Sequence, residues 1–248
     1  MPIQLVVEDL NASIDGKVVL HDVAVTDKAG HVLALMGKTG SGKSTFLRVI
    51  NRMAEQYGAV VSGRIMLDNS SIFMQDPNEL RKRVGMVLTE PVLFAGSVLQ
   101  NITAGLRLQG VTKRQALEEC AEETLRRMDI YNDFKDMLYL DAYALTRSQA
   151  QLTCIARALA LKPGLLLLDE PTRLLDTMTS IKVEDMLFKL KKECTMVVAV
   201  HTPQMAGRIA EETAMMEDGT VLEWSRTSDL FYHPQHLHTE QFVSAKFA

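Results

Sequence analysis

A glycine-rich segment that follows a short apolar run constrains this fold more than any other feature of the chain. Residues Val32–Met36 are apolar throughout and lie between Gly30 and Gly37, which predicts a short buried β-strand. Residues 46–53 then carry apolar side chains at helical spacing. The chain therefore predicts a strand, a tight loop and a helix in direct succession, with the loop at the carboxyl end of the strand.

The loop, residues 37–44, reads GKTGSGKS and matches the pattern G-x-x-x-x-G-K-[ST] in full. Its glycines allow the backbone to curl so that successive N–H groups face one anion, and the following helix adds the positive end of its dipole. We expect Lys43 to neutralise the β- and γ-phosphates of a nucleoside triphosphate and the Ser44 hydroxyl to ligate Mg²⁺. The residues expected to bind the nucleotide through this loop are Gly37, Lys38, Thr39, Gly40, Ser41, Gly42, Lys43, Ser44 and Thr45.

A second motif consists of four leucines, Leu165–Leu168, followed by Asp169 and Glu170. A buried strand that ends in acids places them at the carboxyl edge of a parallel sheet, where the ligands of such sheets bind. We expect Asp169 to hold Mg²⁺ through water, and Glu170 to orient or deprotonate the attacking water. His201 follows a further strand pattern, residues 195–200, and from a neighbouring strand it can reach the γ-phosphate.

The apolar runs, with another at residues 84–88, predict an α/β protein whose parallel sheet is covered by helices on both faces. Strand signals vanish after residue 90, where apolar residues form a helical stripe, and Thr112 and Gln115 resemble a capping box at its start. We expect a single domain over residues 1–248. It combines an α/β core with an N-terminal antiparallel β subdomain (about 1–90 and 160–248) and a helical insertion (about 91–159).

Composition and charge exclude several classes of protein. Hydrophobic residues make up 47% of the chain and charged residues 23%, which is typical of a globular protein rather than a disordered one. A net charge of −4 gives no electrostatic reason to expect a nucleic-acid partner. Three scattered cysteines argue against a disulfide scaffold. We expect neither a signal peptide nor a membrane span, so a membrane role would require a partner.

Taken together, these motifs resemble those of the nucleotide-binding subunits of ABC transporters. The resemblance runs nearly end to end and includes the phosphate-binding loop, LLLLDEP, His201 and IARAL at Ile155–Leu159. Within this superfamily the chain is most similar to the ATP-binding subunit of bacterial phosphate importers, through FLRVINRM at Phe46–Met53, LRKRVGMV at Leu80–Val87 and the tail Leu230–Phe247. The resemblance implies a P-loop NTPase fold with a RecA-like parallel sheet.

The resemblance also implies ATP and Mg²⁺ as cofactors and a defined set of partners. In that family two ABC ATP-binding subunits, of the same or of different chains, sandwich two ATP molecules and drive two transmembrane permease subunits. The permeases receive phosphate from a periplasmic or extracellular solute-binding protein. The implied function is therefore an ATP-hydrolysing importer subunit, bound peripherally at the cytoplasmic face of the cell inner membrane.

The signature motif departs from the family pattern. The family has L-S-G-G-Q, whereas Leu145–Gln149 reads LTRSQ. In the family this loop caps the γ-phosphate held by the opposite subunit, which implies nucleotide contacts from Thr146, Ser148 and Gln149. Arg147 replaces a glycine that permits close backbone approach. It either obstructs this contact or supplies a positive charge, as an arginine finger does.

Three further positions differ from the family. The glutamine that contacts Mg²⁺ aligns with Thr89, which keeps an oxygen with a shorter reach, and Glu90 beside it is a candidate substitute. The aromatic residue that stacks on adenine falls near Ile14, which can pack against the base with less specific geometry. The S-A-L-D loop reads RLLD at Arg173–Asp176, so that its aspartate is kept and its small residues are lost.

The half of the site that one chain owns thus matches the family, whereas the half contributed across the dimer is altered. We expect ATP binding, with hydrolysis slower than in a complete relative, because a missing transition-state partner costs orders of magnitude in phosphoryl transfer. The alternative is a weakly or non-hydrolysing ATP-binding module that acts as a degenerate partner of an intact subunit or as a regulatory protein. A small-molecule kinase is a weaker alternative, since no acceptor-substrate motif appears.

Overall fold

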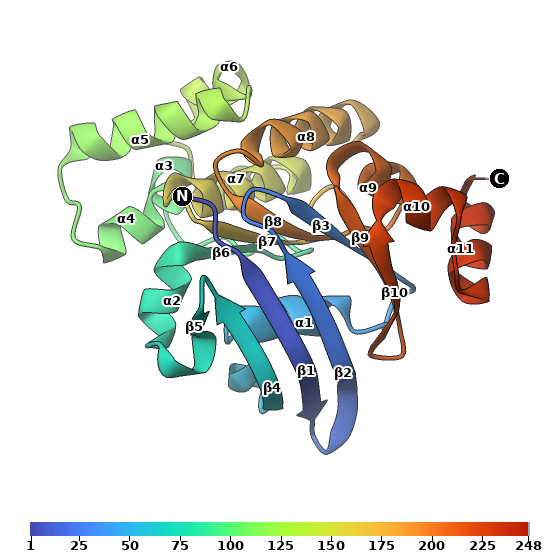
Figure 1. Cartoon of the computed structure of the whole chain (residues 1–248). Helices are drawn as coiled ribbons and strands as arrows, with labels where there is room; N and C mark the ends of the chain where they lie inside the picture. Colours follow the sequence, from blue (N-terminus) through green and yellow to red (C-terminus); the bar gives the residue numbers. More distant parts are fainter. Residues whose placement is uncertain (248) are drawn as a thin grey trace.

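A six-stranded sheet crosses the centre of the molecule in the order β10-β9-β3-β8-β7-β6 (Figure 1). The computed structural model describes the backbone of residues 1–247 and the side chains of residues 1–244. The neighbours from β9 to β6 are parallel, and β10 joins the edge antiparallel to β9. The strands of this sheet are β3 (Val32–Met36), β6 (Val84–Val87), β7 (Leu165–Asp169), β8 (Thr195–Ala199), β9 (Glu212–Glu217) and β10 (Thr220–Arg226).

The apolar runs predicted as strands form β3, β6, β7 and β8, which confirms the α/β fold class. Every residue of β3, β7 and β8 is buried, as expected for central strands covered on both faces. Parallel neighbours end at the same edge of a sheet. The glycine-rich loop after β3 therefore lies beside the residues that follow β6, β7 and β8, and this edge positions the candidate site.

The hairpin of β9 and β10 is absent from the sequence-based prediction. Its strands meet at a tight turn in which Asp218 and Gly219 have φ angles of 45° and 81°. An Asp-Gly pair between two runs of strand-forming residues is a strong hairpin signal. The sequence therefore contained a signal for this hairpin. The apolar residues Met215 and Met216 of β9 are equally compatible with simple packing in the core, so they did not by themselves identify a strand.

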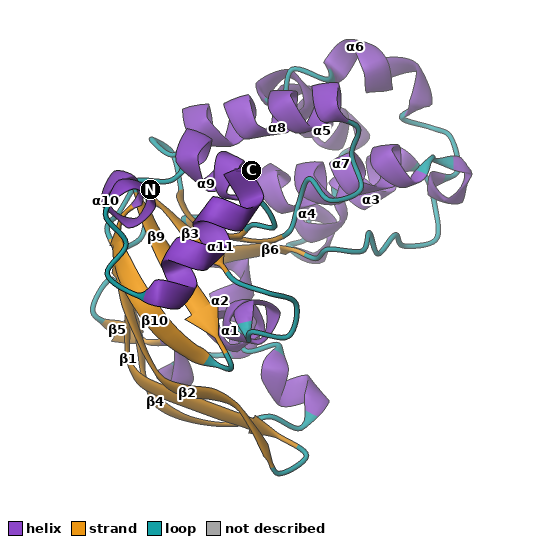
Figure 2. Ribbon diagram, turned by 90° about the vertical axis from the view of Figure 1, so that its right-hand side faces the viewer, coloured by secondary structure: helices purple, strands orange, loops and turns teal. Residues whose placement is uncertain are grey.

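A second, antiparallel sheet packs against the first and confirms the predicted N-terminal β subdomain. Its strand order is β2-β1-β4-β5. The helix α1 (Lys43–Ile50) lies between the two sheets (Figure 2). The strands of this sheet are β1 (Leu5–Ile14), β2 (Lys17–Asp27), β4 (Val60–Leu67) and β5 (Ser70–Ser71).

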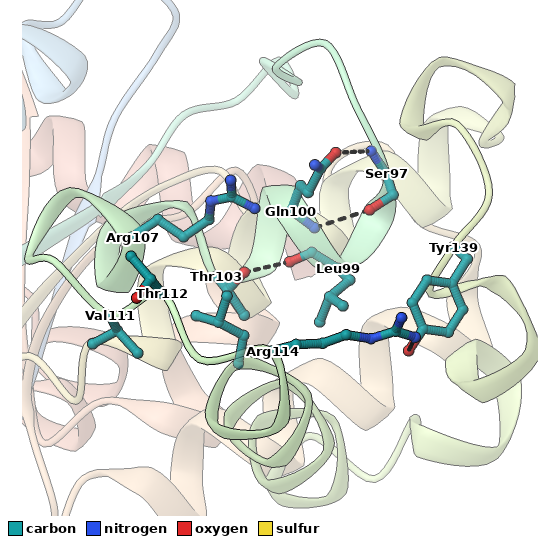
Figure 3. Close-up of a pocket in the computed structure, with 10 residues that line it drawn as sticks. Ser97, Leu99, Gln100, Thr103, Arg107, Val111, Thr112, Arg114 and Tyr139 are labelled. Carbon is teal, nitrogen blue, oxygen red and sulfur yellow. Dashed lines mark hydrogen bonds between the residues drawn. The ribbon is translucent and has the colours of Figure 1, made fainter.

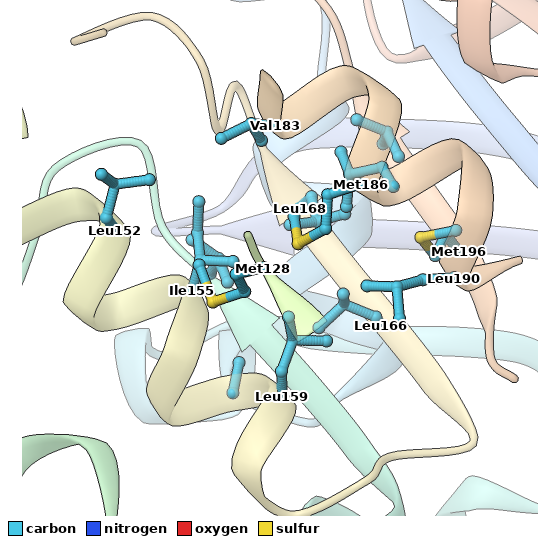
Figure 4. Packing of buried hydrophobic residues seen from close by; sticks show 14 of the residues in the cluster. Met128, Leu152, Ile155, Leu159, Leu166, Leu168, Val183, Met186, Leu190 and Met196 are labelled. Atoms are coloured by element: carbon cyan, nitrogen blue, oxygen red, sulfur yellow. The ribbon is translucent and has the colours of Figure 1, made fainter. Parts of the chain in front are cut away.

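Alternate leucines of β7 belong to two separate apolar cores. Leu165 and Leu167 pack with α1 and the antiparallel sheet. Leu166 and Leu168 pack on the other face, against α7 (Arg147–Ala160) and α8 (Thr177–Leu190) (Figure 4). Each fully buried leucine contributes about 2 kcal/mol relative to an exposed one. These apolar layers hold the strand, and thus the acids at its carboxyl end, from both sides.

Residues between β6 and β7 form helices, and the described part of the chain has no strand there. The predicted apolar stripe lies on α5, where Leu117, Ala121 and Leu125 are buried as predicted. The predicted capping box at its start is wrong. The helix is preceded by Lys113 as N-cap, without a side-chain cap, and Gln115 instead donates to Glu119. The helices of this segment are α3 (Val98–Ile102), α4 (Ala104–Leu108), α5 (Arg114–Arg127), α6 (Tyr131–Phe134) and α7.

The remaining helices cover the outside of the two sheets. They are α2 (Pro77–Arg83), α9 (Pro203–Ile209), α10 (Thr227–Tyr232) and α11 (Leu237–Phe247), with short 3₁₀ turns at Ala54–Tyr57, Ile72–Met74, Lys135–Met137 and Ala142–Ala144. Within residues 1–247, no helix combines the length and the apolar character needed to cross a bilayer.

Asp27 is an acid in the apolar interior, at the end of β2. It is 1% exposed, and no described side chain donates a hydrogen bond to its carboxylate. Burial, together with the nearby carboxylates of Glu212 and Glu211, raises the pKa of Asp27 to about 8. The folded protein therefore keeps a proton on this group that the unfolded chain releases near pH 4.

This raised pKa predicts a pH-dependent stability. Between about pH 4 and pH 8 the folded state binds more protons than the unfolded state at Asp27, so stability falls as the pH rises and levels off above about pH 8. Asp27→Asn removes this dependence, and at about pH 8 it should raise the free energy of unfolding by about 1–2 kcal/mol. Urea unfolding at about pH 6 and pH 8 measures both effects.

The matched control is Asp15→Asn, an exposed acid at the turn between β1 and β2. It should keep the pH dependence of the wild-type protein. If Asp27→Asn keeps that dependence as well, the group responsible lies elsewhere in the chain.

Candidate nucleotide-binding site

The loop between β3 and α1 requires glycine at particular positions. Gly37 has a φ of 145°, and a Cβ atom added there would lie 2.2 Å from the carbonyl oxygen of Met216. Gly42 has a φ of 104° and precedes α1 as its N-cap. These two glycines let the backbone turn tightly and aim the start of α1 at the space above the loop.

The ammonium group of Lys43 lies inside the curl of this loop. Its Nζ donates to the carbonyl oxygens of Gly37, at 2.7 Å, and Lys38, at 3.0 Å, and to Oγ of Ser41, at 3.3 Å. Burial lowers the pKa of Lys43, and the carboxylates of Glu170 and Asp169 act in the opposite direction. A cation is thus held inside the loop by its carbonyl oxygens, which suits a polyphosphate.

Three oxygen-bearing side chains from separate elements converge beside Lys43. The hydroxyl of Ser44, in the first turn of α1, donates to Oδ1 of Asp169, the last residue of β7, at 2.9 Å. Burial raises the pKa of Asp169, while hydrogen bonds from Ser44 and Thr89 and the charge of Arg48 oppose that rise. Hydroxyl and carboxylate oxygens are the ligands that Mg²⁺ prefers. The donor set of Ser44, Asp169 and Thr89 therefore fits this cation.

Glu170 adopts a backbone conformation that L-residues rarely take. Its φ is 46°, and its N–H donates to the carbonyl oxygen of Ala199 at 3.1 Å, which ties the end of β7 to β8. Its Oε2 lies 3.3 Å from the guanidinium of Arg173. The Glu170 side chain is 16% exposed, so it is sheltered and still reachable by water.

These groups share one cavity of about 270 Å³ at the carboxyl edge of the parallel sheet. Gly37 and Lys38 lie behind it as acceptors for Lys43, and Asp169 is buried beneath Ser44. The cavity is lined by Val19, Thr39, Gly40, Ser41, Gly42, Lys43, Ser44, Thr45, Thr89, Glu170 and Arg173. The residues predicted from two separate motifs thus meet in one place.

Ile14 and His201, also predicted for this site, do not line the cavity either. Ile14 ends β1 at the tip of a hairpin, where it pairs with Lys17, and Val19 on the adjoining strand reaches the cavity instead. His201 follows β8 at the same edge of the sheet as Glu170, with its side chain exposed. The roles predicted for Ile14 and His201 stay predictions.

The altered signature motif lies at the start of α7, outside this cavity. The hydroxyl of Thr146 accepts from the N–H of Gln149, and the Gln149 side chain accepts from the N–H of Thr146, which forms a capping box. Ser148 is half-buried in the first turn of the same helix. The nucleotide contacts predicted for Thr146, Ser148 and Gln149 stay predictions.

Arg147, the residue that departs most from the family motif, forms an ion pair with Glu90. Both side chains are exposed, and the pair joins the start of α7 to the segment that follows β6. The Glu90 carboxylate considered above as a substitute Mg²⁺ ligand is thus engaged with Arg147, whereas Thr89 faces the cavity.

Several residues of the site escaped the sequence-based prediction. No motif around Val19 indicates a role in the site, because Val19 reaches the cavity from a strand of the antiparallel sheet. Arg173 appeared only as a departure from the S-A-L-D loop. Gln151 is fully buried and donates to the carbonyl oxygens of Leu88, at 3.1 Å, and Pro171, at 3.5 Å, which joins the segments that follow β6 and β7.

Comparison with known proteins gives the family of the chain. Residues 20–173 match the family model described as ABC transporter. The chain is 38% identical over 246 residues to the phosphate import ATP-binding protein PstB 1 of Streptococcus agalactiae serotype III (strain NEM316), covering 98% of each chain. It is also 38% identical to the protein of the same name from Enterococcus faecalis (strain ATCC 700802 / V583), over 97% of this chain and 96% of the relative.

Solved structures agree with this fold. A bacterial Atm1-family ABC exporter with ATP bound superposes with a TM-score of 0.86 at 22% identity, covering all of this chain and 42% of the exporter chain. CbiO1 from Clostridium perfringens, part of the ABC transporter complex cbiONQ, superposes with a TM-score of 0.79 at 27% identity, over 94% of this chain and 92% of that one. The chain therefore belongs to the ABC transporter family, as an ATP-binding subunit with the ABC ATPase fold.

Proposed function

We propose that this chain is the ATP-hydrolysing subunit of an ABC importer for inorganic phosphate. The observation that carries the chemistry is the convergence of Lys43, Ser44 and Glu170 on one cavity at the sheet edge, with Asp169 beneath it as the hydrogen-bond acceptor of Ser44. The solute is inferred from relatives named as phosphate import ATP-binding proteins, which are similar over 96–98% of their length.

In this proposal the loop and Lys43 bind the polyphosphate of ATP through N–H groups and the ammonium. Ser44, Asp169 and Thr89 would hold Mg²⁺, which neutralises charge on the β- and γ-phosphates. Glu170 accepts a proton from water as the water oxygen bonds to the γ-phosphorus. The bond from that phosphorus to its bridging oxygen breaks, and ADP and inorganic phosphate leave.

A second ATP-binding subunit would complete the site. Thr146, Ser148 and Gln149 lie outside the cavity of their own chain, so their contribution would be to the nucleotide held by the partner. Closure of two such subunits over ATP would then transmit force to the membrane subunits. In this proposal the chain is a peripheral subunit at the cytoplasmic face of the inner membrane.

A large cavity in the helical segment is our candidate docking site for a permease subunit. It has a volume of about 540 Å³ and lies among α3, α4 and α5 (Figure 3). Arg107 gives it positive charge, Arg114 at its wall is paired with Glu118 at 2.6 Å, and Leu99, Val111 and Leu117 give it apolar surface. This mixture suits an amphipathic segment that carries acidic residues.

One observation favours a second candidate function, a weakly hydrolysing module paired with an intact subunit. The ion pair of Arg147 with Glu90 holds a bulky side chain at the start of α7, where the family has glycine. Backbone approach to a partner's nucleotide is more difficult there. In such a heterodimer this chain would still bind ATP through its own loop and face the signature motif of its partner.

Two substitutions separate nucleotide binding from hydrolysis. Lys43→Ala removes the buried cation and should weaken ATP binding by about tenfold or more. Glu170→Gln should retain binding and slow turnover by about 10²–10⁴-fold, because it removes the proton acceptor. Equilibrium dialysis with Mg²⁺ and ATP, together with phosphate release, measures both quantities.

The matched control for Lys43→Ala is Lys192→Ala, an exposed lysine that follows α8. It should bind and hydrolyse ATP as the wild-type chain does. Unchanged turnover in Glu170→Gln would contradict the catalytic role of Glu170.

The solute can be tested in cells. Deletion of the gene should reduce uptake of radiolabelled phosphate at low external phosphate, and the wild-type gene should restore it. The Glu170→Gln gene should not restore uptake, because ATP-driven transport requires hydrolysis. Sulfate uptake serves as the control and should not change. Phosphate uptake that survives deletion of the gene would argue against the proposed solute.

Charge reversal tests the docking cavity. Arg107→Glu should abolish co-purification of the chain with its permease subunits, because it repels an acidic partner segment. The isolated variant should bind ATP normally, since Arg107 is remote from the phosphate-binding loop in the fold. Lys192→Glu, which also reverses a charge but lies outside this cavity, should still co-purify with the permease subunits. Normal assembly of Arg107→Glu would place the permease contact elsewhere.

A further inference from the structure

Arg173 brings a second cation to the phosphate-binding cavity. Its side chain lines the same cavity as Lys43 and Ser44, and its guanidinium forms the ion pair with Glu170 at 3.3 Å. Arg173 stands where the pattern of the resembling family, S-A-L-D, has a serine, so that pattern supplies no cation at this position. The pair joins the proposed proton acceptor directly to a neighbouring positive charge.

The backbone around Arg173 is fixed by short-range hydrogen bonds. The N–H of Arg173 donates to the carbonyl oxygen of Glu170 at 3.1 Å, and the N–H of Leu175 donates to that of Thr172 at 3.0 Å. Asp176 then caps α8 by accepting from the N–H of Thr179 at 2.9 Å. The backbone of Arg173 is therefore held in place, whereas its long side chain can move between interaction partners.

Exposure shows which end of the ion pair can change partner. The Arg173 side chain is 57% exposed, whereas that of Glu170 is 16% exposed. The guanidinium therefore lies toward the mouth of the cavity, and it has donors beyond the one that contacts Glu170. Exposed ion pairs of this kind contribute about 0–1 kcal/mol, so a stronger anion can displace the carboxylate.

We propose that Arg173 is shared between Glu170 and the terminal phosphate of bound ATP. This inference rests on the proposed ATP-binding function. Without nucleotide the guanidinium neutralises Glu170. With ATP in the loop, the γ-phosphate carries more negative charge than a single carboxylate and accepts the guanidinium, which releases Glu170 to receive the proton of the attacking water. Arg173 thereby supplies, within one chain, positive charge at the phosphoryl group.

Arg147 cannot take this role in its own subunit. It lies at the start of α7, is paired with Glu90 and does not line the cavity. Of Arg147 and Arg173, which replace small residues of the family motifs, only Arg173 lines the cavity of the phosphate-binding loop in its own chain. The proposal therefore predicts an effect that depends on the γ-phosphate and is measurable on the isolated chain.

The experiment compares ADP with the non-hydrolysable β,γ-imido analogue of ATP, both with Mg²⁺, by isothermal titration on the full chain. Arg173→Ser should weaken binding of the analogue by about tenfold and leave ADP binding unchanged, because only the analogue carries a γ-phosphate. Arg173→Lys should restore part of the loss, since lysine keeps the charge without the planar fork. Equal effects on both nucleotides, or none on either, would overturn the proposal.

A double-mutant cycle with Glu170→Gln tests the sharing itself. If Glu170 and the γ-phosphate compete for one guanidinium, Glu170→Gln should strengthen analogue binding more with Arg173 present than in Arg173→Ser. The same gain in both backgrounds would overturn the competition. The control is Arg64→Ser, which breaks an exposed ion pair with Glu8 on the antiparallel sheet and should alter neither affinity.

The failure of the proposed function has a different outcome. A wild-type chain that binds neither nucleotide would overturn the proposed function and this inference together. A negative result in the phosphate-uptake test would overturn only the solute, because the titrations use the isolated chain.

Discussion

The hydrogen bond from Ser44 to Asp169, at 2.9 Å, joins two segments that lie 125 residues apart in the sequence. It depends on the register of the parallel sheet, in which β3 pairs with β8 and β8 pairs with β7. A shift of that register by one residue would turn the Asp169 side chain to the opposite face of the sheet and away from the loop. The site therefore depends on the packing that fixes these three strands.

That packing explains why two apolar cores are needed. The central strands are buried on both faces, so each strand contributes alternate residues to the core around α1 and to the core under α7 and α8. The loop glycines then remove the side chains that would otherwise collide at the strand ends, as at Gly37, where an added Cβ atom would overlap the Met216 carbonyl. Apolar burial supplies the rigidity, and the glycines supply the space for an anion.

Sequence reasoning predicted the parts of this architecture that are encoded by local sequence patterns. Short runs such as Leu165–Leu168 identify central strands, and the match at residues 37–44 identifies a phosphate-binding loop with its preceding strand and following helix. Contacts made by folding were not predictable in this way. Val19 reaches the cavity from a different sheet, and Arg147 meets Glu90 across 57 residues of sequence. Neither contact corresponds to a residue spacing or a composition that can be recognised in the sequence.

The two arginines at altered family positions illustrate how the same change can have different consequences. Each lies beside an acid, Arg147 next to Glu90 and Arg173 next to Glu170, and each pair is partly or fully exposed. Such pairs add little to stability, so stability alone does not explain their presence. What distinguishes them is where the guanidinium faces. Arg173 opens onto the cavity of the phosphate-binding loop, where by our proposal its charge would act on the terminal phosphate, whereas Arg147 joins two surface segments outside that cavity. The electrostatic effect of each arginine therefore depends on whether its guanidinium lines the cavity, and not on the acid with which it pairs.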